Sequence, residues 1–260
     1  MKKIIRKIRL ALSLYLFDPF LIPARFAALA GYFKDLGKWK RLNPDGPFRF
    51  TMGNAVPLVS DAVSQAAGIR GHYFFQDVWA AKIIIRSKAA EHVDVGSSMA
   101  GFVAPLLSSG VAVKFVDIRP LDVSMEGLTC IPGSITDLPF ETGSQKSLSS
   151  LHVLEHIGLG RYGDPLDPAG HAKAAKELVR VLEPGGRLLI GVPVGRERLC
   201  FNAHRVFDPQ HVVDLFAGCR LIEFAAVPDS GDRIIAGLTP AEMTDAEFAC
   251  GLYYFVKEDK

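Results

Sequence analysis

The residues that could carry chemistry gather where predicted strands end. The segment His92-Val-Asp-Val-Gly-Ser-Ser-Met-Ala-Gly101 places an acid and a glycine after an apolar strand, followed by small residues. Small residues let the backbone approach a ligand closely, and the helix that follows offers unpaired N–H groups. Asp117 ends the next predicted strand, and its carboxylate can accept two hydrogen bonds from ribose hydroxyls. This pattern is typical of a nucleotide site, although the turn alone is equally consistent with an ordinary glycine turn.

A second group of polar residues occupies a glycine-rich loop. His156-Ile-Gly-Leu-Gly-Arg-Tyr-Gly-Asp164 carries an imidazole, a guanidinium, a phenol and a carboxylate. Its three glycines indicate a shaped loop that covers an active site as a lid. Asn202-Ala-His-Arg205 follows the next predicted strand and should open onto the same end of the sheet. We predict that the catalytic groups are His156 or His204 as a general base, with Asp164, and that the substrate-binding residues are Arg161, Tyr162 and Arg205. Local capping of the strand by Glu155 and His156 is the alternative.

The elements that position these residues begin at residue 91, where strands start to alternate with helices. Strands are predicted at 91–95, 111–116, 128–131, 148–153, 187–192, 221–227 and 252–256, and helices at 97–109, 168–182 and 208–216. Pro184-Gly185-Gly186 is expected to stop the second helix. This alternation predicts an open, mostly parallel α/β sheet with helices on both faces and an antiparallel edge, and ligands bind such sheets at the carboxyl ends of the strands.

Residues 1–90 predict a basic, mainly helical extension of the α/β domain at 91–260. The first fifty residues hold eleven Lys and Arg against three acids, and residues 74–86 predict a helix with an apolar face. No segment reaches the ~18–20 apolar residues that cross a bilayer. Residues 2–17 predict an amphipathic helix that could lie on an anionic membrane surface; the alternative is a helix packed on the domain with its lysines solvated.

The composition narrows the classes of partner and compartment. Four cysteines lie far apart without a C-x-x-C pair, which favours reduced thiols in a cytoplasmic protein. If residues 2–17 bind a membrane, the protein is expected to lie peripherally at its inner face. A net charge of +2 does not favour a nucleic-acid partner. No constellation of metal ligands stands out, so no metal is expected.

Taken in order along about residues 91–227, several segments resemble class I S-adenosylmethionine-dependent methyltransferases. They are the first turn, Asp117, Gly133-Ser-Ile-Thr-Asp-Leu-Pro-Phe140, Leu151-His-Val-Leu-Glu-His156 and the run from Lys176 to Pro193. His72-Tyr-Phe-Phe-Gln-Asp-Val-Trp-Ala-Ala81 and the run from His156 to Pro165 look like the domain of unknown function 268 family. The resemblance implies a Rossmann-like sheet and S-adenosylmethionine as the cofactor.

The resemblance also implies roles for individual residues. Asp94 and Gly96, with Ser97, would hold the methionine end of the cofactor. Asp117 would bind the ribose, Ile118 would pack on the adenine, Ser134 and Ile135 would lie beside the adenine edge, and His152 would lie near the end of the fourth strand. The sequence departs from the family pattern at four places. Ser98 and Ala100 replace the second and third glycines of the first turn. Ser134 stands where an acid commonly contacts the adenine amino group, and Lys146-Ser147 replace the acidic–apolar start of the fourth strand.

The function predicted on this basis is methyl transfer from S-adenosylmethionine to oxygen, with a sugar, a glycan or another small polar molecule as acceptor. A nicotinamide-dependent oxidoreductase or epimerase is a weaker alternative, since the chain lacks a glycine-rich dinucleotide turn and a Tyr-x-x-x-Lys pair. A non-catalytic binding or scaffold protein on the same fold is the other alternative.

Overall fold

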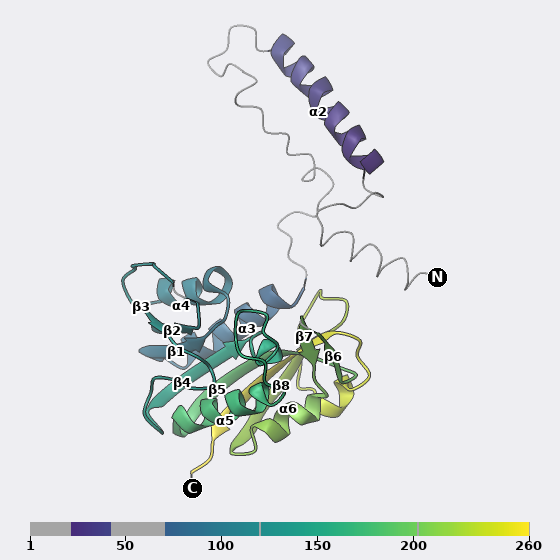
Figure 1. The fold of residues 1–260 in the computed structure, drawn as a ribbon. Helices are drawn as coiled ribbons and strands as arrows, with labels where there is room; N and C mark the ends of the chain where they lie inside the picture. The colour runs from purple at the N-terminus through teal and green to yellow at the C-terminus, as the bar shows by residue number, and fades with distance from the viewer. Residues whose placement is uncertain (1–21, 43–70, 120, 202, 260) are drawn as a thin grey trace. The chain divides into compact units, whose positions relative to one another are not determined.

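The computed structural model describes residues 22–42, 71–119, 121–201 and 203–259 (Figure 1). The chain divides into two compact units, residues 1–68 and 69–260. In the first unit α2 (Ile22–Leu42) is a helix of 21 residues. Within the described ranges, no helix combines the length and the apolar character that crossing a bilayer requires. The predicted membrane-surface helix at 2–17 lies outside these ranges.

The second unit contains an eight-stranded sheet with the order β3-β2-β1-β4-β5-β10-β8-β9. Its strands are β1 (Glu91–Val95), β2 (Ala112–Asp117), β3 (Leu128–Pro132), β4 (Gln145–Leu151), β5 (Leu182–Val194), β8 (Cys219–Val227), β9 (Ile235–Ala236) and β10 (Ala249–Lys257). Strands β1 to β5 are parallel, whereas β10 runs antiparallel to both β5 and β8. The predicted mostly parallel sheet with an antiparallel edge is confirmed, since β9 at the edge runs antiparallel to β8; a second antiparallel strand, β10, lies inside the sheet between β5 and β8.

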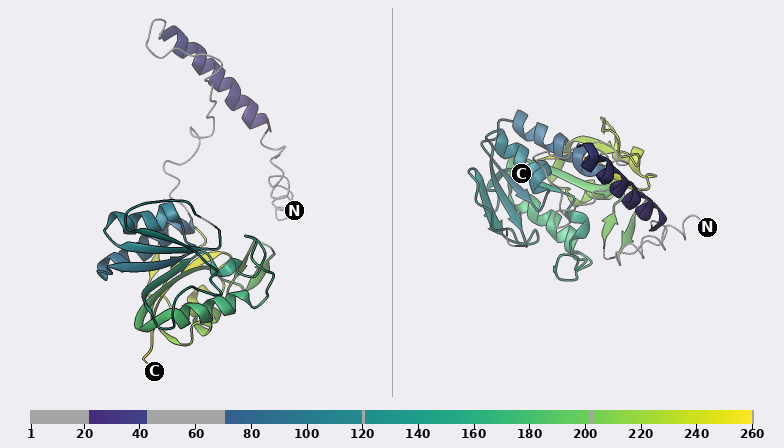
Figure 2. Two further views of the ribbon diagram at one scale, coloured as in Figure 1. Left: turned by 60° about the vertical axis from the view of Figure 1, so that its left-hand side comes forward. Right: turned by 90° about the horizontal axis from the view of Figure 1, so that it is seen from above.

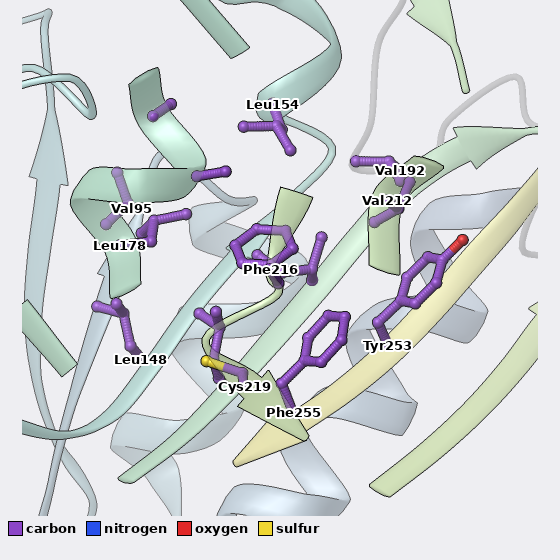
Figure 3. Close-up of a cluster of buried hydrophobic side chains, with 14 of the residues drawn as sticks. Val95, Leu148, Leu154, Leu178, Val192, Val212, Phe216, Cys219, Tyr253 and Phe255 are labelled. Carbon is purple, nitrogen blue, oxygen red and sulfur yellow. The ribbon is translucent and has the colours of Figure 1, made fainter. Parts of the chain in front are cut away.

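Helices cover both faces of this sheet, as predicted (Figure 2). One face packs against α3 (His72–Arg86) and α4 (Ala104–Ser108), through buried side chains such as Trp79, Ile84 and Leu106. The other face packs against α5 (Gly170–Val181) and α6 (Pro209–Leu215). Figure 3 shows this second core, in which Leu178, Val212 and Phe216 meet side chains of the sheet. The alternation of side chains along each strand supplies both cores.

Three local features differ from the predicted elements. The helix after β1 starts as a π-helix (Met99–Val103), and Ser98 caps it by accepting a hydrogen bond from the Gly101 N–H. The helix α5 ends at Val181, before the predicted stop, because Leu182 is already extended and β5 runs through Pro184-Gly185-Gly186. Strand β4 covers 145–151 rather than 148–153, and it ends where His152 adopts a positive φ of 55°.

The compact α/β unit begins before the predicted boundary at residue 90. Helix α3 lies within the unit that contains the sheet, and it buries six side chains there, those of Gln76, Asp77, Trp79, Ala80, Ala81 and Ile84. The apolar face of this helix therefore belongs to the core of the domain rather than to the N-terminal extension. A hairpin of β6 (Arg198–Cys200) and β7 (His204–Val206) follows β5.

Candidate functional site

The turn after β1 requires glycine at position 96 on two grounds. Gly96 has a φ of 73°, a conformation that other L-residues rarely adopt. A Cβ atom there would also lie 3.1 Å from Cγ2 of Val153, a contact that forces a shift. The Gly96 N–H donates to the Val116 carbonyl oxygen at 2.9 Å, so the turn is held against β2.

Asp94, at the end of β1, fixes this turn by hydrogen bonds. Its buried carboxylate accepts hydrogen bonds from the Ser97 N–H at 3.0 Å, from the Ser97 hydroxyl at 2.6 Å and from the Ser149 hydroxyl. The Ser97 Oγ in turn accepts from the Leu151 N–H at 3.0 Å, which ties the end of β1 to the end of β4. Burial raises the pKa of Asp94 to about 6. Asp94 and Ser97 thus position the turn, and neither lines the neighbouring cavity.

The hydrogen bonds of Asp94 continue into a buried polar chain between β1 and β4. His92 lies between two serine hydroxyls, with Nδ1 2.8 Å from Ser147 Oγ and Nε2 2.8 Å from Ser149 Oγ. Because the Ser149 hydroxyl donates to Asp94, it accepts from Nε2–H of His92, whose Nδ1 then accepts from Ser147. Burial lowers the pKa of His92 to about 3, so the ring stays neutral. Ser147, a departure from the family pattern, completes this chain.

A cavity of about 890 Å³, counted with the solvent at its mouth, opens above the carboxyl ends of β1, β2 and β4. Six of the eight residues predicted to bind the cofactor line it, namely Gly96, Asp117, Ile118, Ser134, Ile135 and His152. From the glycine-rich loop, His156, Tyr162 and Asp164 also line it. The other predicted site residues, Arg161, His204 and Arg205, lie outside the lining.

Asp117 presents its carboxylate at the edge of the cavity and is already engaged by a neighbour. The Arg119 guanidinium donates to both carboxylate oxygens, at 2.9 Å and 2.7 Å, and the Arg119 N–H donates at 2.8 Å. Burial alone would raise the pKa of Asp117, but the hydrogen bonds from Arg119 lower it below its ordinary value. The carboxylate is therefore ionised at neutral pH. Beside it, Ile118 leaves 46% of its surface exposed, an apolar contact for a flat ring.

The glycine-rich loop is fastened to the domain by the charged side chains that were predicted to act on a substrate. The Asp164 carboxylate accepts from the Gly158 N–H at 2.7 Å and from the Tyr162 N–H at 3.3 Å. Arg205 donates to the Ile157 carbonyl oxygen at 2.7 Å. Arg161 likewise donates to a backbone oxygen, that of Ala203, at 2.9 Å, and its guanidinium lies 5.1 Å from the centroid of the Tyr162 ring. These contacts shape the loop whether or not the same groups meet a substrate.

Of the two predicted bases, His156 lines the cavity and His204 does not. Nδ1 of His156 donates to the Ala203 carbonyl oxygen at 2.7 Å, which leaves the lone pair on Nε2. Burial lowers the pKa of His156 below 6.5, so the ring is neutral at pH 7. His204 instead packs its ring on Phe248, with centroids 5.1 Å apart.

Helix α3 places two buried polar residues, Gln76 and Asp77, near the first turn, and neither of them lines the cavity. A Cβ atom on Gly101, in the first turn, would overlap Oδ2 of Asp77, so this carboxylate lies directly against the turn. Burial raises the pKa of Asp77 to about 6, and Gln76 donates to its Oδ1 at 3.2 Å. The available signal was a Gln-Asp pair within an otherwise apolar helix, which indicates polar groups on a buried face.

His152, which lines the cavity, has an unusual environment. Its Nδ1 lies 2.7 Å from Oε1 of the buried Glu155, and its ring lies parallel to that of His72 at a centroid distance of 5.2 Å. Burial alone would lower the pKa of His152, but Cys250 and Glu155 raise it well above its ordinary value. Nε2 of this ring has no hydrogen-bond partner among the described residues.

Comparisons with known proteins confirm the fold and the predicted resemblance. Residues 142–233 match the model of the DUF268 family, described as a Caenorhabditis protein of unknown function. A search of curated protein sequences gave no match.

Three solved structures are similar over most of the α/β unit. The N-methyltransferase NodS of Bradyrhizobium japonicum, with bound S-adenosylhomocysteine, has 16% identity over 70% of this chain and 86% of its own, with a TM-score of 0.50. The 1,6-didemethyltoxoflavin-N1-methyltransferase of Burkholderia thailandensis, with the same ligand, has 19% identity over 71% and 82%, with a TM-score of 0.50. The [4+2]-cyclase SpnF has 14% identity over 75% and 90%, with a TM-score of 0.51. The chain therefore has the class I methyltransferase fold, which supports more than one reaction.

Proposed function

We propose that the protein transfers a methyl group from S-adenosylmethionine to a small polar acceptor, and that the acceptor atom is the oxygen of a sugar or glycan hydroxyl. The observation that carries this proposal is the composition of the cavity. A glycine turn, an ionised acid, an exposed apolar side chain and a neutral histidine surround one space, and such convergent polar groups are typical of small-molecule sites.

The side chains present fit the proposed cofactor. Asp117 is ionised and can accept from ribose hydroxyls, provided that it shares its oxygens with Arg119 or releases it. Ile118 and Ile135 offer apolar contacts for the adenine, while Gly96 leaves the turn without a side chain. Asp77, beside the first turn, is a candidate partner for the ammonium group. When bound, S-adenosylmethionine supplies an electrophilic methyl group on a sulfonium ion.

His156 is the proposed general base for a hydroxyl acceptor. Its Nδ1–H is committed to the Ala203 carbonyl oxygen, so Nε2 is the atom that would take the proton. Because burial lowers its pKa, the ring holds no competing proton at pH 7. The loop that carries His156 would exclude water and hold the acceptor near Tyr162 and Asp164, which also line the cavity.

The proposed acceptor rests on the chemistry of the loop and of the N-terminus. Phenol, carboxylate and imidazole groups at the cavity suit a polyhydroxylated molecule. A basic amphipathic segment at residues 2–17 would bring the enzyme to an anionic membrane surface, where lipid-linked glycan precursors reside. Deleting residues 2–17 should then release the protein from anionic liposomes, and unchanged binding would refute the membrane contact.

A non-catalytic binding protein is the second candidate, because Arg119 already occupies Asp117 and a cyclase shares the fold. Isothermal calorimetry with S-adenosylmethionine, S-adenosylhomocysteine and NAD separates the candidates. We expect both sulfur compounds to bind and NAD not to bind. Binding of NAD alone would contradict the proposal, and the absence of any binding would favour the scaffold.

A further inference from the structure

Three side chains from distant parts of the chain meet between α3 and the sheet. His72 is the first residue of α3, His152 follows β4 and Cys250 lies in β10. One nitrogen of each ring and the sulfur all lie within 4.8 Å of one another. A tetrahedral zinc site spaces such atoms roughly 3.3–3.8 Å apart, given Zn–N and Zn–S bonds of about 2.0 and 2.3 Å. We propose that these three side chains bind one divalent metal ion of the zinc class.

The strongest support is the unpartnered nitrogen of His152. Its side chain is only 5% exposed, and Nε2 has no hydrogen bond among the described residues, although buried polar atoms are rarely left unpaired. Its Nδ1 faces the Glu155 carboxylate at 2.7 Å, so the ring keeps a proton on Nδ1, and Nε2 is the nitrogen that would lose its proton to bind an ion. A histidine that donates one N–H to a carboxylate and binds an ion through its other nitrogen is the usual arrangement of metal-bound histidines.

The other two side chains are also available as ligands. Nε2 of His72 lies 3.1 Å from the Phe248 carbonyl oxygen and must donate to it, so the lone pair of this ring is on Nδ1. The nearest oxygen partners of the Cys250 sulfur lie 3.8 Å away, on Gln76 and Gly251, and these long contacts hold a thiol weakly. Neither group is committed to a strong interaction that an ion would have to break.

The donor set selects the metal. Imidazole nitrogens and a thiolate suit zinc and similar transition metals, whereas magnesium and calcium prefer oxygen ligands. Three protein ligands leave a fourth position, as in catalytic rather than structural zinc sites. His152 also lines the cavity, whereas His72 and Cys250 do not. Metal binding itself does not depend on the proposed methyl transfer.

The test uses the full chain, freed of any affinity tag, stripped with a chelator and reloaded. We expect one zinc per chain by mass spectrometry of the metal after dialysis. With Co²⁺ in place of zinc, we expect the charge-transfer absorption of a thiolate–cobalt bond. Cys250→Ser should abolish that absorption, and Cys219→Ser, which changes a buried cysteine on the opposite face of the sheet, should leave it unchanged.

Two further variants keep the test informative if Cys250→Ser does not fold. His72→Ala, at the half-buried start of α3, should weaken zinc binding at least ~10-fold, and Glu155→Gln should weaken it roughly 10–100-fold through His152. Each of three outcomes would refute the site. They are a zinc content no higher than that of the stripped protein, binding of cobalt without the thiolate absorption, and an equal zinc content in wild type and His72→Ala. Titrating S-adenosylhomocysteine into stripped and loaded protein shows separately whether the cofactor proposal holds.

Discussion

The cavity has a proposed cofactor half, around Gly96 and Asp117, and a proposed acceptor half, formed by the glycine-rich loop 156–164. Different contacts stabilise the two halves. In the proposed cofactor half, Asp117 is fixed by its near neighbour Arg119, and the buried Asp94 accepts from Ser97 and from Ser149, 55 residues away. In the proposed acceptor half, Asp164 binds the amides of its own loop, and His156 meets Ala203, 47 residues away. Asp94 and Ser97 are buried beside the ends of the strands, whereas most of residues 161–169 are exposed. The acceptor half should therefore open more easily.

Removing Asp94 should have the largest effect, because the cofactor half depends on it. Asp94→Leu leaves the Ser97 N–H and two buried hydroxyls without an acceptor, at a cost of about 3–5 kcal/mol in the free energy of unfolding. Urea denaturation measures this loss. The exposed Asp122→Ala should change stability by less than about 0.5 kcal/mol. A loss below 1 kcal/mol for Asp94→Leu would show that the turn does not need this carboxylate.

Removing Asp117 should weaken the cofactor half without unfolding it. A hydrogen-bonded charged group contributes about 1.5–3 kcal/mol, so Asp117→Ala should raise the Kd for S-adenosylhomocysteine roughly 10–100-fold. Isothermal calorimetry gives the affinity, and Asp122→Ala is again the control. An unchanged Kd in Asp117→Ala would refute the assignment of this carboxylate to the ribose.

Removing Arg205 should affect only the acceptor half. Arg205→Ala deletes the hydrogen bond to the Ile157 carbonyl oxygen, so the amides of residues 157–167 should exchange about 10-fold faster, equivalent to ~1.4 kcal/mol. Hydrogen exchange followed by mass spectrometry also reports residues 94–98, which should be unaffected. If exchange in the loop does not change, Arg205 does not hold the loop, and the predicted role as a substrate anchor becomes the better account.

The last prediction concerns pH and Asp77, which lies against the first turn. Its pKa is raised to about 6 in the folded protein, above the ordinary value of 3.8. As pH rises from about 4 to about 6, the unfolded chain releases this proton first, so the folded state loses stability and does not regain it at higher pH. Asp77→Asn should therefore gain stability relative to wild type across that window, in urea denaturation at several pH values. A pH-independent difference would show that the carboxyl is not perturbed.

The difference between local and distant contacts explains what the sequence could predict. Strand β1, the glycine turn and Asp117 were predictable because short-range patterns carry them. The role of Arg205 was not, because its partners are backbone carbonyl oxygens that leave no mark in the sequence. The meeting of His72, His152 and Cys250 was also hidden. It depends on α3 covering the sheet and on β10 lying between β5 and β8, and neither follows from spacing along the chain.

The most direct test of the central claim is a crystal structure with S-adenosylhomocysteine bound. We predict that the adenine lies against Ile118, that the ribose hydroxyls bond to Asp117 in place of, or together with, Arg119, and that the sulfur lies on the side of His152 and His156. A ligand bound elsewhere, or a ribose without contact to Asp117, would contradict the account.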